Sequence, residues 1–130
     1  MNKVIHFELP ADNTDRAKKF YKETFDWQTE DVPDMNYIIL RTAEIDEKMM
    51  IKESGAINGG MFKRSDMDNM INGPTFAIDV EDIDSAVKKI KNAGGLILKE
   101  KTPVGDMGFI AYFKDTEGNI LSVWQNAEKM

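Results

Sequence analysis

Two stretches of this chain repeat one pattern at a constant offset. Residues 6–17 read HFELPADNTDRA, and residues 75–86 read TFAIDVEDIDSA. Apolar and acidic positions coincide, so that Phe7 aligns with Phe76 and Asp15 with Asp84. Two copies are too few for a solenoid, which needs about three repeats to bury a continuous core. We therefore predict two similar half-domains, each with one uncovered sheet face, that enclose a cleft suited to a ligand.

The first half begins with a short strand and a helix. Residues 4–9 are rich in strand-forming side chains, and Pro10 is expected to end this strand because proline donates no hydrogen bond. Asn13 is suited to cap a helix, and apolar residues at helical spacing follow it. The pattern predicts a helix at 14–25, followed by strands at 27–31 and 37–42 and by weaker strand signals at 49–52 and 57–63.

The second half repeats this order. Asp82 is the expected cap, and Gly94-Gly95 supplies a residue that commonly ends a helix. The pattern predicts a strand at 75–80, a helix at 83–93, and strands at 96–101, 108–114 and 119–125. The fold class is therefore α+β, with two tandem βαβββ modules that form a curved mixed sheet around a cleft. The predicted boundaries are one domain at 1–130, with a first module at 1–64, a polar linker at 65–74 and a second module at 75–130.

Charge and composition exclude several function classes. The net charge of −6 argues against nucleic acid, since binding to phosphates needs a basic surface. Apolar runs are far shorter than the roughly 20 residues that a membrane span needs, and no signal peptide is visible at the N-terminus. The chain has no cysteine, so it has neither disulfides nor a thiolate metal site. We expect a cytoplasmic protein with no membrane or nucleic-acid partner.

Several motifs on this layout resemble one superfamily. They are the paired βαβββ pattern, residues 11–21 (ADNTDRAKKFY), residues 113–119 (FKDTEGN), residues 57–61 (INGGM) and residues 107–113 (MGFIAYF). Together they resemble the vicinal oxygen chelate superfamily of glyoxalase I, bleomycin-resistance proteins and extradiol dioxygenases. Within it, the chain looks most similar to glyoxalase-like proteins related to lactoylglutathione lyase. The resemblance implies the fold, but this scaffold carries isomerases, lyases, dioxygenases and non-catalytic binding proteins.

The resemblance also implies four metal-ligand positions, on the first and fourth strands of each module. His6 occupies the first of them, whereas the matching position in the second module is Thr75 and the last-strand position falls on Ser122. The fourth strand of the first module offers only Gly59, Gly60 and Met61. Since His6 is the one histidine of the chain, a site with two imidazoles cannot form. We expect no metal, with His6 as the only matching position, and keep a divalent ion as the alternative.

Two side chains are candidates for catalysis. Glu8 lies two residues after His6 and so on the same face of the strand. Burial in a cleft would raise the pKa of such a carboxyl group toward neutrality and suit it to acid–base chemistry. The alternatives are a hydrogen-bonded or cavity-lining His6 and a solvated Glu8. A metal site of His6, Glu8 and Asp79 is a further arrangement, although the first two side chains splay apart on one strand.

The predicted ligand-binding residues are mostly on the second module. Trp124 shares a strand face with Ser122 and would stack on a flat ligand or simply fill the core. The glycine pair 59–60 inside a strand would open space for a ligand or only permit a bend. The full predicted set is Gly60, Thr75, Tyr112, Ser122 and Trp124.

Two functions remain open at this point. One is a protein that binds a small organic molecule in the cleft without a metal ion. The other is a metal-dependent lyase, isomerase or dioxygenase that acts on a small substrate with vicinal oxygens. We also expect a homodimer, because open sheets leave edges and apolar faces to cover. The expected contacts are residues 2–5 and the methionine-rich stretch 61–71.

Overall fold

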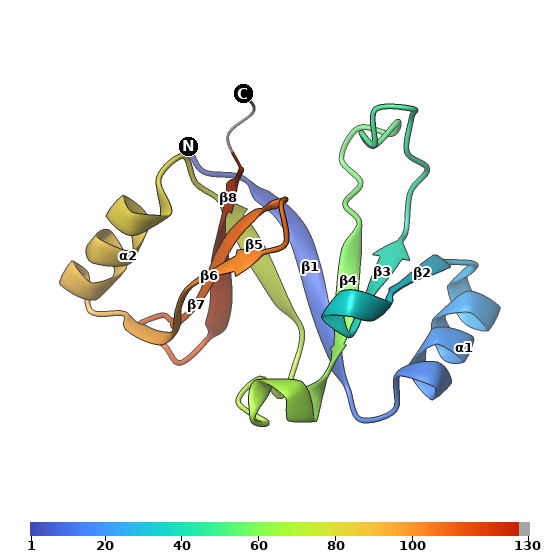
Figure 1. Ribbon diagram of the computed structural model, residues 1–130, viewed down its shortest axis with the longest axis horizontal. Coiled ribbons are helices and arrows are strands. Elements are labelled where there is room, and N and C mark those ends of the chain that lie inside the picture. The colour runs from blue at the N-terminus through green and yellow to red at the C-terminus, as the bar shows by residue number, and fades with distance from the viewer. Residues whose placement is uncertain (128–130) are drawn as a thin grey trace. The chain divides into compact units, whose positions relative to one another are not determined.

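A computed structural model describes residues 1–127 of the chain, which divides into two compact units (Figure 1). The N-terminal module comprises His6–Pro74, and the C-terminal module comprises Met1–Ile5 together with the chain from Thr75 onward. The first residues of the chain thus belong with its second half. The backbone N–H of Asp79 donates to the Lys3 carbonyl oxygen at 2.8 Å, and the Asn2 side chain donates to the Asp79 carbonyl oxygen at 3.0 Å.

The N-terminal module has the predicted βαβββ order. Its elements are β1 (Val4–Ala11), α1 (Thr14–Phe25), β2 (Gln28–Val32), a 3₁₀ turn at Pro33–Met35, β3 (Tyr37–Arg41), β4 (Gly59–Lys63) and a 3₁₀ turn at Arg64–Met67. In the sheet, β1 pairs with β4 in parallel, and β3 joins β4 to β2 through antiparallel pairs. The side chain of Asn13 caps α1 by accepting from the Arg16 N–H at 2.9 Å, as predicted.

The core of the N-terminal module is small. Its buried members are Ala11, Ile38, Leu40 and Met61, and Phe7, Leu9, Ala17 and Trp27 pack against them. Helix α1 contributes no buried residue of its own. It is held mainly through aromatic rings, since Tyr21 stacks on Trp27 with ring centroids 4.7 Å apart.

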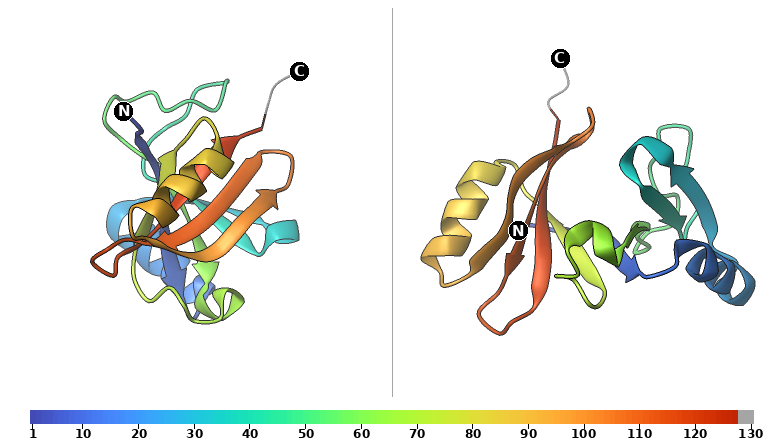
Figure 2. Two further views of the ribbon diagram at one scale, coloured as in Figure 1. Left: turned by 90° about the vertical axis from the view of Figure 1, so that its left-hand side faces the viewer. Right: turned by 60° about the horizontal axis from the view of Figure 1, so that its bottom comes forward.

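The C-terminal module repeats the same order. Its elements are β5 (Thr75–Asp79), α2 (Ile83–Asn92), β6 (Leu96–Val104), β7 (Gly108–Lys114) and β8 (Ile120–Asn126). Strand β5 pairs with β8 in parallel, and β7 joins β8 to β6 through antiparallel pairs. The Asp82 side chain caps α2, as predicted. Helix α2 lies along one face of this sheet and contacts β6, β7 and β8 (Figure 2).

The core of the C-terminal module lies between α2 and its sheet. Ile83 and Val87 of α2 are buried against Ala111 and Phe113 of β7 and against Leu121 and Val123 of β8. Since side chains alternate along a strand, Ser122 and Tyr112 lie on the opposite face of the sheet, away from α2.

Two local predictions are wrong. Pro10 does not end β1, which continues to Ala11 in register with β4; the missing N–H is tolerated close to the end of the strand. The expected strand at 49–52 is absent, and Ile51 makes only an isolated bridge to Ile45. The Asp46 side chain accepts from the N–H groups of Lys48 and Met50, so this segment folds on itself as a turn.

The stretch expected to be a linker and a dimer contact has a few buried apolar residues among mostly exposed ones. It contains the 3₁₀ turn Arg64–Met67, and Ile71 is 2% exposed. Met61 and Phe62 are also buried within the N-terminal module. Met61 packs in the core of the N-terminal module, whereas Met70 is exposed. The expected dimer contact stays a prediction.

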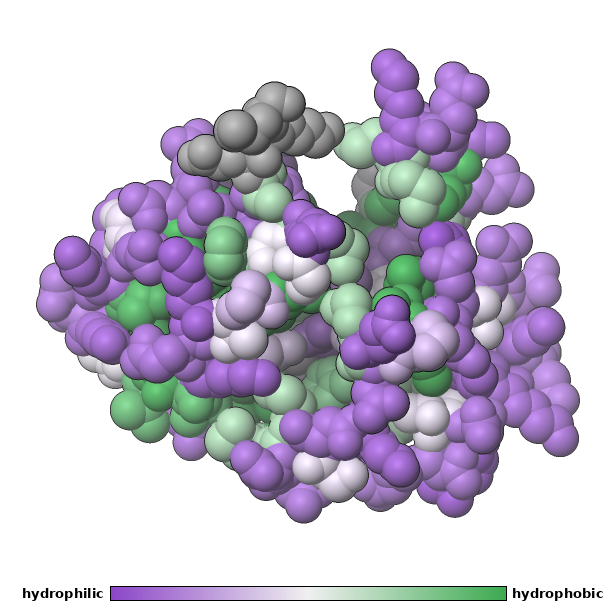
Figure 3. All heavy atoms as spheres, viewed as in Figure 1, coloured by the Kyte–Doolittle hydropathy of each residue, from purple (hydrophilic) through white to green (hydrophobic). Residues whose placement is uncertain are grey.

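Hydrophilic residues cover most of the face of the protein shown in Figure 3, with hydrophobic residues in smaller patches between them. Exposed apolar side chains include Phe20 and Phe25 on α1. Within residues 1–127, neither helix has the length and apolar character needed to cross a membrane.

Candidate functional site

The sheet of the N-terminal module carries a polar group on one face. Phe7 and Leu9 of β1 pack into the core, so His6 and Glu8 lie on the opposite face of the sheet. Tyr37, the first residue of β3, has the same orientation, since its neighbour Ile38 is in the core. The structure thus brings the two predicted catalytic residues together with a tyrosine that sequence reasoning did not single out.

The Tyr37 hydroxyl joins the two other side chains. It donates a hydrogen bond to Oε2 of Glu8 at 2.8 Å and lies 2.8 Å from Nε2 of His6. The rings of His6 and Tyr37 are roughly parallel, with centroids 6.4 Å apart. Glu8 is 5% exposed, so this carboxyl group is nearly removed from solvent. We call these three residues the His6–Tyr37–Glu8 group.

Gly60 makes room for this group. Gly60 lies opposite Glu8 in the β1/β4 pairing and opposite Ile39 in the β3/β4 pairing. A Cβ atom at position 60 would lie 1.8 Å from Oη of Tyr37. The tyrosine hydroxyl therefore occupies the space that any other side chain at this position would need. The glycine that seemed to open space for a ligand opens it for Tyr37.

The local sequence explains how Tyr37 reaches this place. The 3₁₀ turn that begins at Pro33 ends at Asn36, whose φ of +50° is a left-handed conformation that asparagine adopts more readily than most residues. The chain then enters β3 at Tyr37. An asparagine before an aromatic, alternating strand was the available sequence signal, but it does not show which side chains the ring will meet.

Burial affects the ionisation of the histidine. It lowers the pKa of His6 below the ordinary value of 6.5, and the nearby Glu8 carboxylate opposes this effect only in part. The imidazole is therefore neutral at pH 7. A neutral imidazole has one N–H donor and one lone-pair acceptor, so His6 is able to pass a proton or to accept a hydrogen bond from a ligand.

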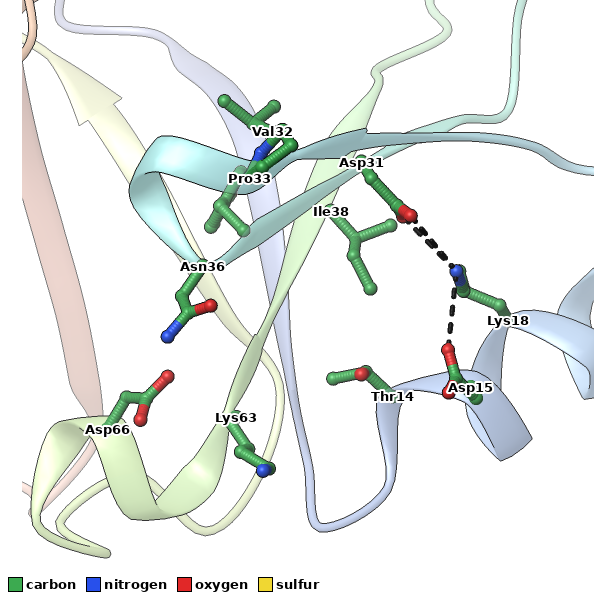
Figure 4. Close-up of a pocket in the computed structure, with 11 residues that line it drawn as sticks. Thr14, Asp15, Lys18, Asp31, Val32, Pro33, Asn36, Ile38, Lys63 and Asp66 are labelled. Atoms are coloured by element: carbon green, nitrogen blue, oxygen red, sulfur yellow. Dashed lines mark hydrogen bonds and ion pairs between the residues drawn. The ribbon is translucent and has the colours of Figure 1, made fainter.

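The N-terminal module has an open pocket whose lining comes from α1, β2, β3, β4 and the two 3₁₀ turns (Figure 4). Its volume is about 290 Å³, and Tyr37 and Ile38 form part of its wall. The Lys18 ammonium bonds Asp31 of β2 at 3.1 Å and Asp15 of its own helix at 3.4 Å. The hydrogen bond to Asp31 is the main reason that the pKa of Lys18 is raised. None of the predicted site residues lines this pocket. Tyr37 is the one residue that belongs both to the pocket wall and to the His6–Tyr37–Glu8 group.

The other predicted residues lie in the C-terminal module. Thr75 and Ser122 are buried, at 2% and 0% exposure. The Thr75 hydroxyl donates to the carbonyl oxygen of Ile120 at 2.7 Å, whereas the Ser122 hydroxyl is buried without a hydrogen-bond partner among the described residues. Tyr112 faces Ser122 across the β7/β8 pairing. The structure therefore brings Ser122 and Tyr112 together on one sheet face.

Trp124 is only partly buried, so it does not act simply as core filler. Its indole Nε1 donates to Oδ1 of Asn126 at 2.7 Å. This hydrogen bond holds the indole near the end of β8. The one polar atom of the ring already has a partner, and part of the ring lies over Gly108, where a Cβ atom would be 2.7 Å from Cζ2 of Trp124.

The family follows from a comparison of the whole sequence. The sequence pattern of the Glyoxalase/Bleomycin resistance protein/Dioxygenase superfamily matches residues 3–123. The chain belongs to this superfamily. The predicted resemblance is thereby confirmed, and the α+β fold with two βαβββ modules is the one expected of a glyoxalase-superfamily member.

Individual relatives agree with this membership. The chain is 28% identical to a "Probable lactoylglutathione lyase" of Vibrio parahaemolyticus, over 97% of this chain and 92% of that protein. Among solved structures, it resembles a hypothetical protein of Bacillus halodurans with a TM-score of 0.66 at 16% identity, covering 99% and 97% of the two chains. It also resembles a methylmalonyl-CoA epimerase variant of Streptomyces coelicolor, with a TM-score of 0.66 at 14% identity and coverage of 98% and 99%. At such identities the structures show a shared fold alone.

The described side chains show no cluster of ligands of the kind that a divalent metal ion needs. Within residues 1–127, no three or more His, Cys, Asp or Glu side chains come together as a metal site. Nε2 of His6 and Oε2 of Glu8 both contact the Tyr37 hydroxyl, and Thr75 and Ser122 offer only neutral hydroxyls.

Proposed function

We propose that this glyoxalase-superfamily protein binds a small organic molecule at the His6–Tyr37–Glu8 group, and that it does so without a divalent metal ion. The observation that supports this proposal is the continuous set of hydrogen bonds that joins an imidazole, a phenol and a nearly buried carboxylate. A few convergent polar groups on a largely apolar surface are typical of small-molecule sites.

The chemistry of the group defines what it offers a ligand. A phenol and an imidazole supply both donors and acceptors, and the carboxyl group supplies acceptor oxygens. The same three groups are also those that general acid–base catalysis uses, so we propose His6 and Glu8 as the catalytic residues if the bound molecule reacts. The Tyr37 hydroxyl would then connect them.

Ligand contacts within the C-terminal module by itself are also proposed, at Thr75, Tyr112, Ser122 and Trp124. The buried Ser122 hydroxyl supports this, because such a group normally has a hydrogen-bond partner and here has none among residues 1–127. A ligand oxygen or an ordered water would complete its hydrogen bonding. Gly60 contributes to binding at the His6–Tyr37–Glu8 group indirectly, by giving space to Tyr37.

The test is isothermal titration calorimetry of the purified protein against S-lactoylglutathione, methylmalonyl-CoA, lactate and pyruvate, with and without EDTA. The first two probes follow from the names of the relatives. We expect at least one to bind equally well in EDTA. Tyr37→Phe should weaken that binding by roughly three- to tenfold, the size of one hydrogen bond, while Tyr21→Phe, a tyrosine in the aromatic stack of α1, should bind like the wild type.

The second candidate function is a metal-dependent lyase, isomerase or dioxygenase, which the likeness to a probable lactoylglutathione lyase favours. Elemental analysis of protein purified without a metal-affinity tag distinguishes the two functions. A stoichiometric divalent metal that is lost in His6→Ala, together with binding abolished by EDTA, would contradict the metal-free proposal. Metal-free protein that still binds a probe would support it.

We further propose that the protein is a cytoplasmic homodimer. The residues expected at the contact include the exposed Val4 and Met70, and uncovered sheet edges support the same proposal. Light scattering after size-exclusion chromatography measures the mass. A value that stays near 14.8 kDa at every concentration would show a monomer.

A further inference from the structure

The hydrogen bonds of the His6–Tyr37–Glu8 group have a direction. A hydroxyl carries one proton, and Tyr37 donates it to the Glu8 carboxylate, which only accepts. The phenol oxygen must then accept from its other neighbour at 2.8 Å, Nε2 of His6. Nε2 therefore carries the proton of the neutral imidazole, and Nδ1 keeps its lone pair.

Within residues 1–127, the histidine has no other hydrogen-bond partner that would reverse this arrangement. Among the described residues, Tyr37 is the one hydrogen-bond partner of the His6 ring. Burial lowers the pKa of His6 and so keeps the ring neutral, with a single proton to place. Whether Nδ1 carries a proton is thus decided by the hydrogen bond between Nε2 and Tyr37.

The position of Tyr37 in turn depends on Gly60. The distance of 1.8 Å that would separate a Cβ atom at residue 60 from Oη of Tyr37 is far shorter than any real contact, and the aromatic carbons behind the hydroxyl would lie at 2.0 and 2.3 Å. The phenol could not remain there with any side chain at position 60. Gly60 and Tyr37 therefore depend on each other: the ring of Tyr37 from β3 fills the space that a side chain at position 60 of β4 would occupy.

We propose that Tyr37, held over Gly60, is a positioning residue that fixes His6 as the Nε2–H tautomer, so that Nδ1 is a hydrogen-bond acceptor for a hydroxyl or N–H group of the bound molecule. This inference assumes the proposed function, because it needs a molecule that binds beside His6. It adds the kind of group on the ligand that His6 recognises. That group is a hydrogen-bond donor rather than a bare carbonyl or a cation.

The test uses the fact that His6 is the only histidine of the chain. ¹⁵N NMR of histidine-labelled protein distinguishes a protonated ring nitrogen from one with a lone pair, without any ligand. We expect a single Nε2–H tautomer in the wild type. Tyr37→Phe should reduce the tautomer ratio by about tenfold, the effect of one hydrogen bond. Gly60→Ala should do the same by displacing the ring.

Matched controls separate this role from general disturbance. Tyr21→Phe removes a hydroxyl from the aromatic stack of α1, and Gly73→Ala adds a Cβ where no atom lies within 4 Å. Both should keep the wild-type tautomer. If Gly60→Ala does not fold, the double variant Gly60→Ala/Tyr37→Ala removes the clash; it should fold and still show mixed tautomers.

A ligand pair tests the recognised group. Lactate offers a hydroxyl donor where pyruvate offers only a carbonyl, so lactate should shift the Nδ1 resonance of the wild type and pyruvate should not. A wild-type Nδ1–H tautomer, or an unchanged ratio in Tyr37→Phe, would overturn the inference, as would an equal shift with both probes. Failure of every probe in calorimetry would instead count against the proposed function, and the tautomer result would stand independently.

Discussion

The two modules share one chain path but differ in the polar residues at the centre of their sheets. Glu8 faces Gly60 across the β1/β4 pair, and the matching positions in the second copy are Ala77 and Ser122, which face each other across β5/β8. One copy holds a carboxylate in hydrogen bonds, whereas the other holds small neutral side chains. At these matching positions the two modules share a fold, and the carboxyl group lies in one of them only.

The two helices differ in how many apolar side chains they bury, and here the C-terminal module has more. Helix α2 buries Ile83 and Val87 in a core of six buried residues, whereas α1 has no buried residue and a core of four beside it. The module with the polar group is thus the one with less apolar burial, and burial of apolar area is the main source of stability. The following predictions test this contrast, from the largest expected effect to the smallest.

The largest effect is expected in the core of the C-terminal module. Ile83→Ala removes a side chain with 0% exposure and should lower the free energy of unfolding by about 2–5 kcal/mol. Phe20→Ala on α1, where the ring is 55% exposed, should cost less than about 1 kcal/mol. Urea denaturation measures both values. Equal losses would mean that α1 is as firmly packed as α2.

The next effect contrasts Gly60 with Ser122, which occupy equivalent sheet positions. Gly60→Ala should lower the free energy of unfolding by about 1–3 kcal/mol, because the new methyl group overlaps the Tyr37 ring. Ser122→Ala removes a hydroxyl without a partner among the described residues, so it should leave stability within about 1 kcal/mol of the wild type or raise it. A large loss in Ser122→Ala would reveal a hidden hydrogen bond.

A smaller effect concerns pH. The folded protein lowers the pKa of His6, so near and below pH 6.5 the unfolded chain binds more protons than the folded one. Stability should therefore fall as the pH drops from 6.5 toward the lowered pKa. His6→Gln should flatten this part of the stability curve, while Thr75→Val, at the matching position of the other module, should keep the wild-type slope. An unchanged slope in His6→Gln would contradict the assignment.

The smallest effect is expected at a surface ion pair. Lys18 of α1 matches Val87 of α2 in the repeat, but it bonds Asp31 instead of entering a core. Because Asp31 is 61% exposed, Lys18→Ala should cost no more than about 1 kcal/mol, and the cost should shrink in high salt. A salt-independent loss would indicate that the Lys18 side chain contributes by packing.

Much of the fold was predictable because its signals are local. Helical spacing and caps at Asn13 and Asp82 located α1 at the predicted residues and α2 to within one residue at its end. Strand β7 also has the predicted bounds. The weak strand signal at 49–52 failed because Asp46 satisfies the nearby backbone groups itself, and a periodicity of apolar residues does not report such a turn.

The sequence by itself determined the βαβββ order of each half, the superfamily, and the placement of His6 and Glu8 on one strand face, because all three follow from residue types at fixed spacing. Only the tertiary structure decided that Tyr37 joins them, since strand order and register bring together residues 29 and 31 positions apart. It also decided what Gly60 does. A glycine in a sequence shows that space exists, and the neighbour that fills the space belongs to another strand.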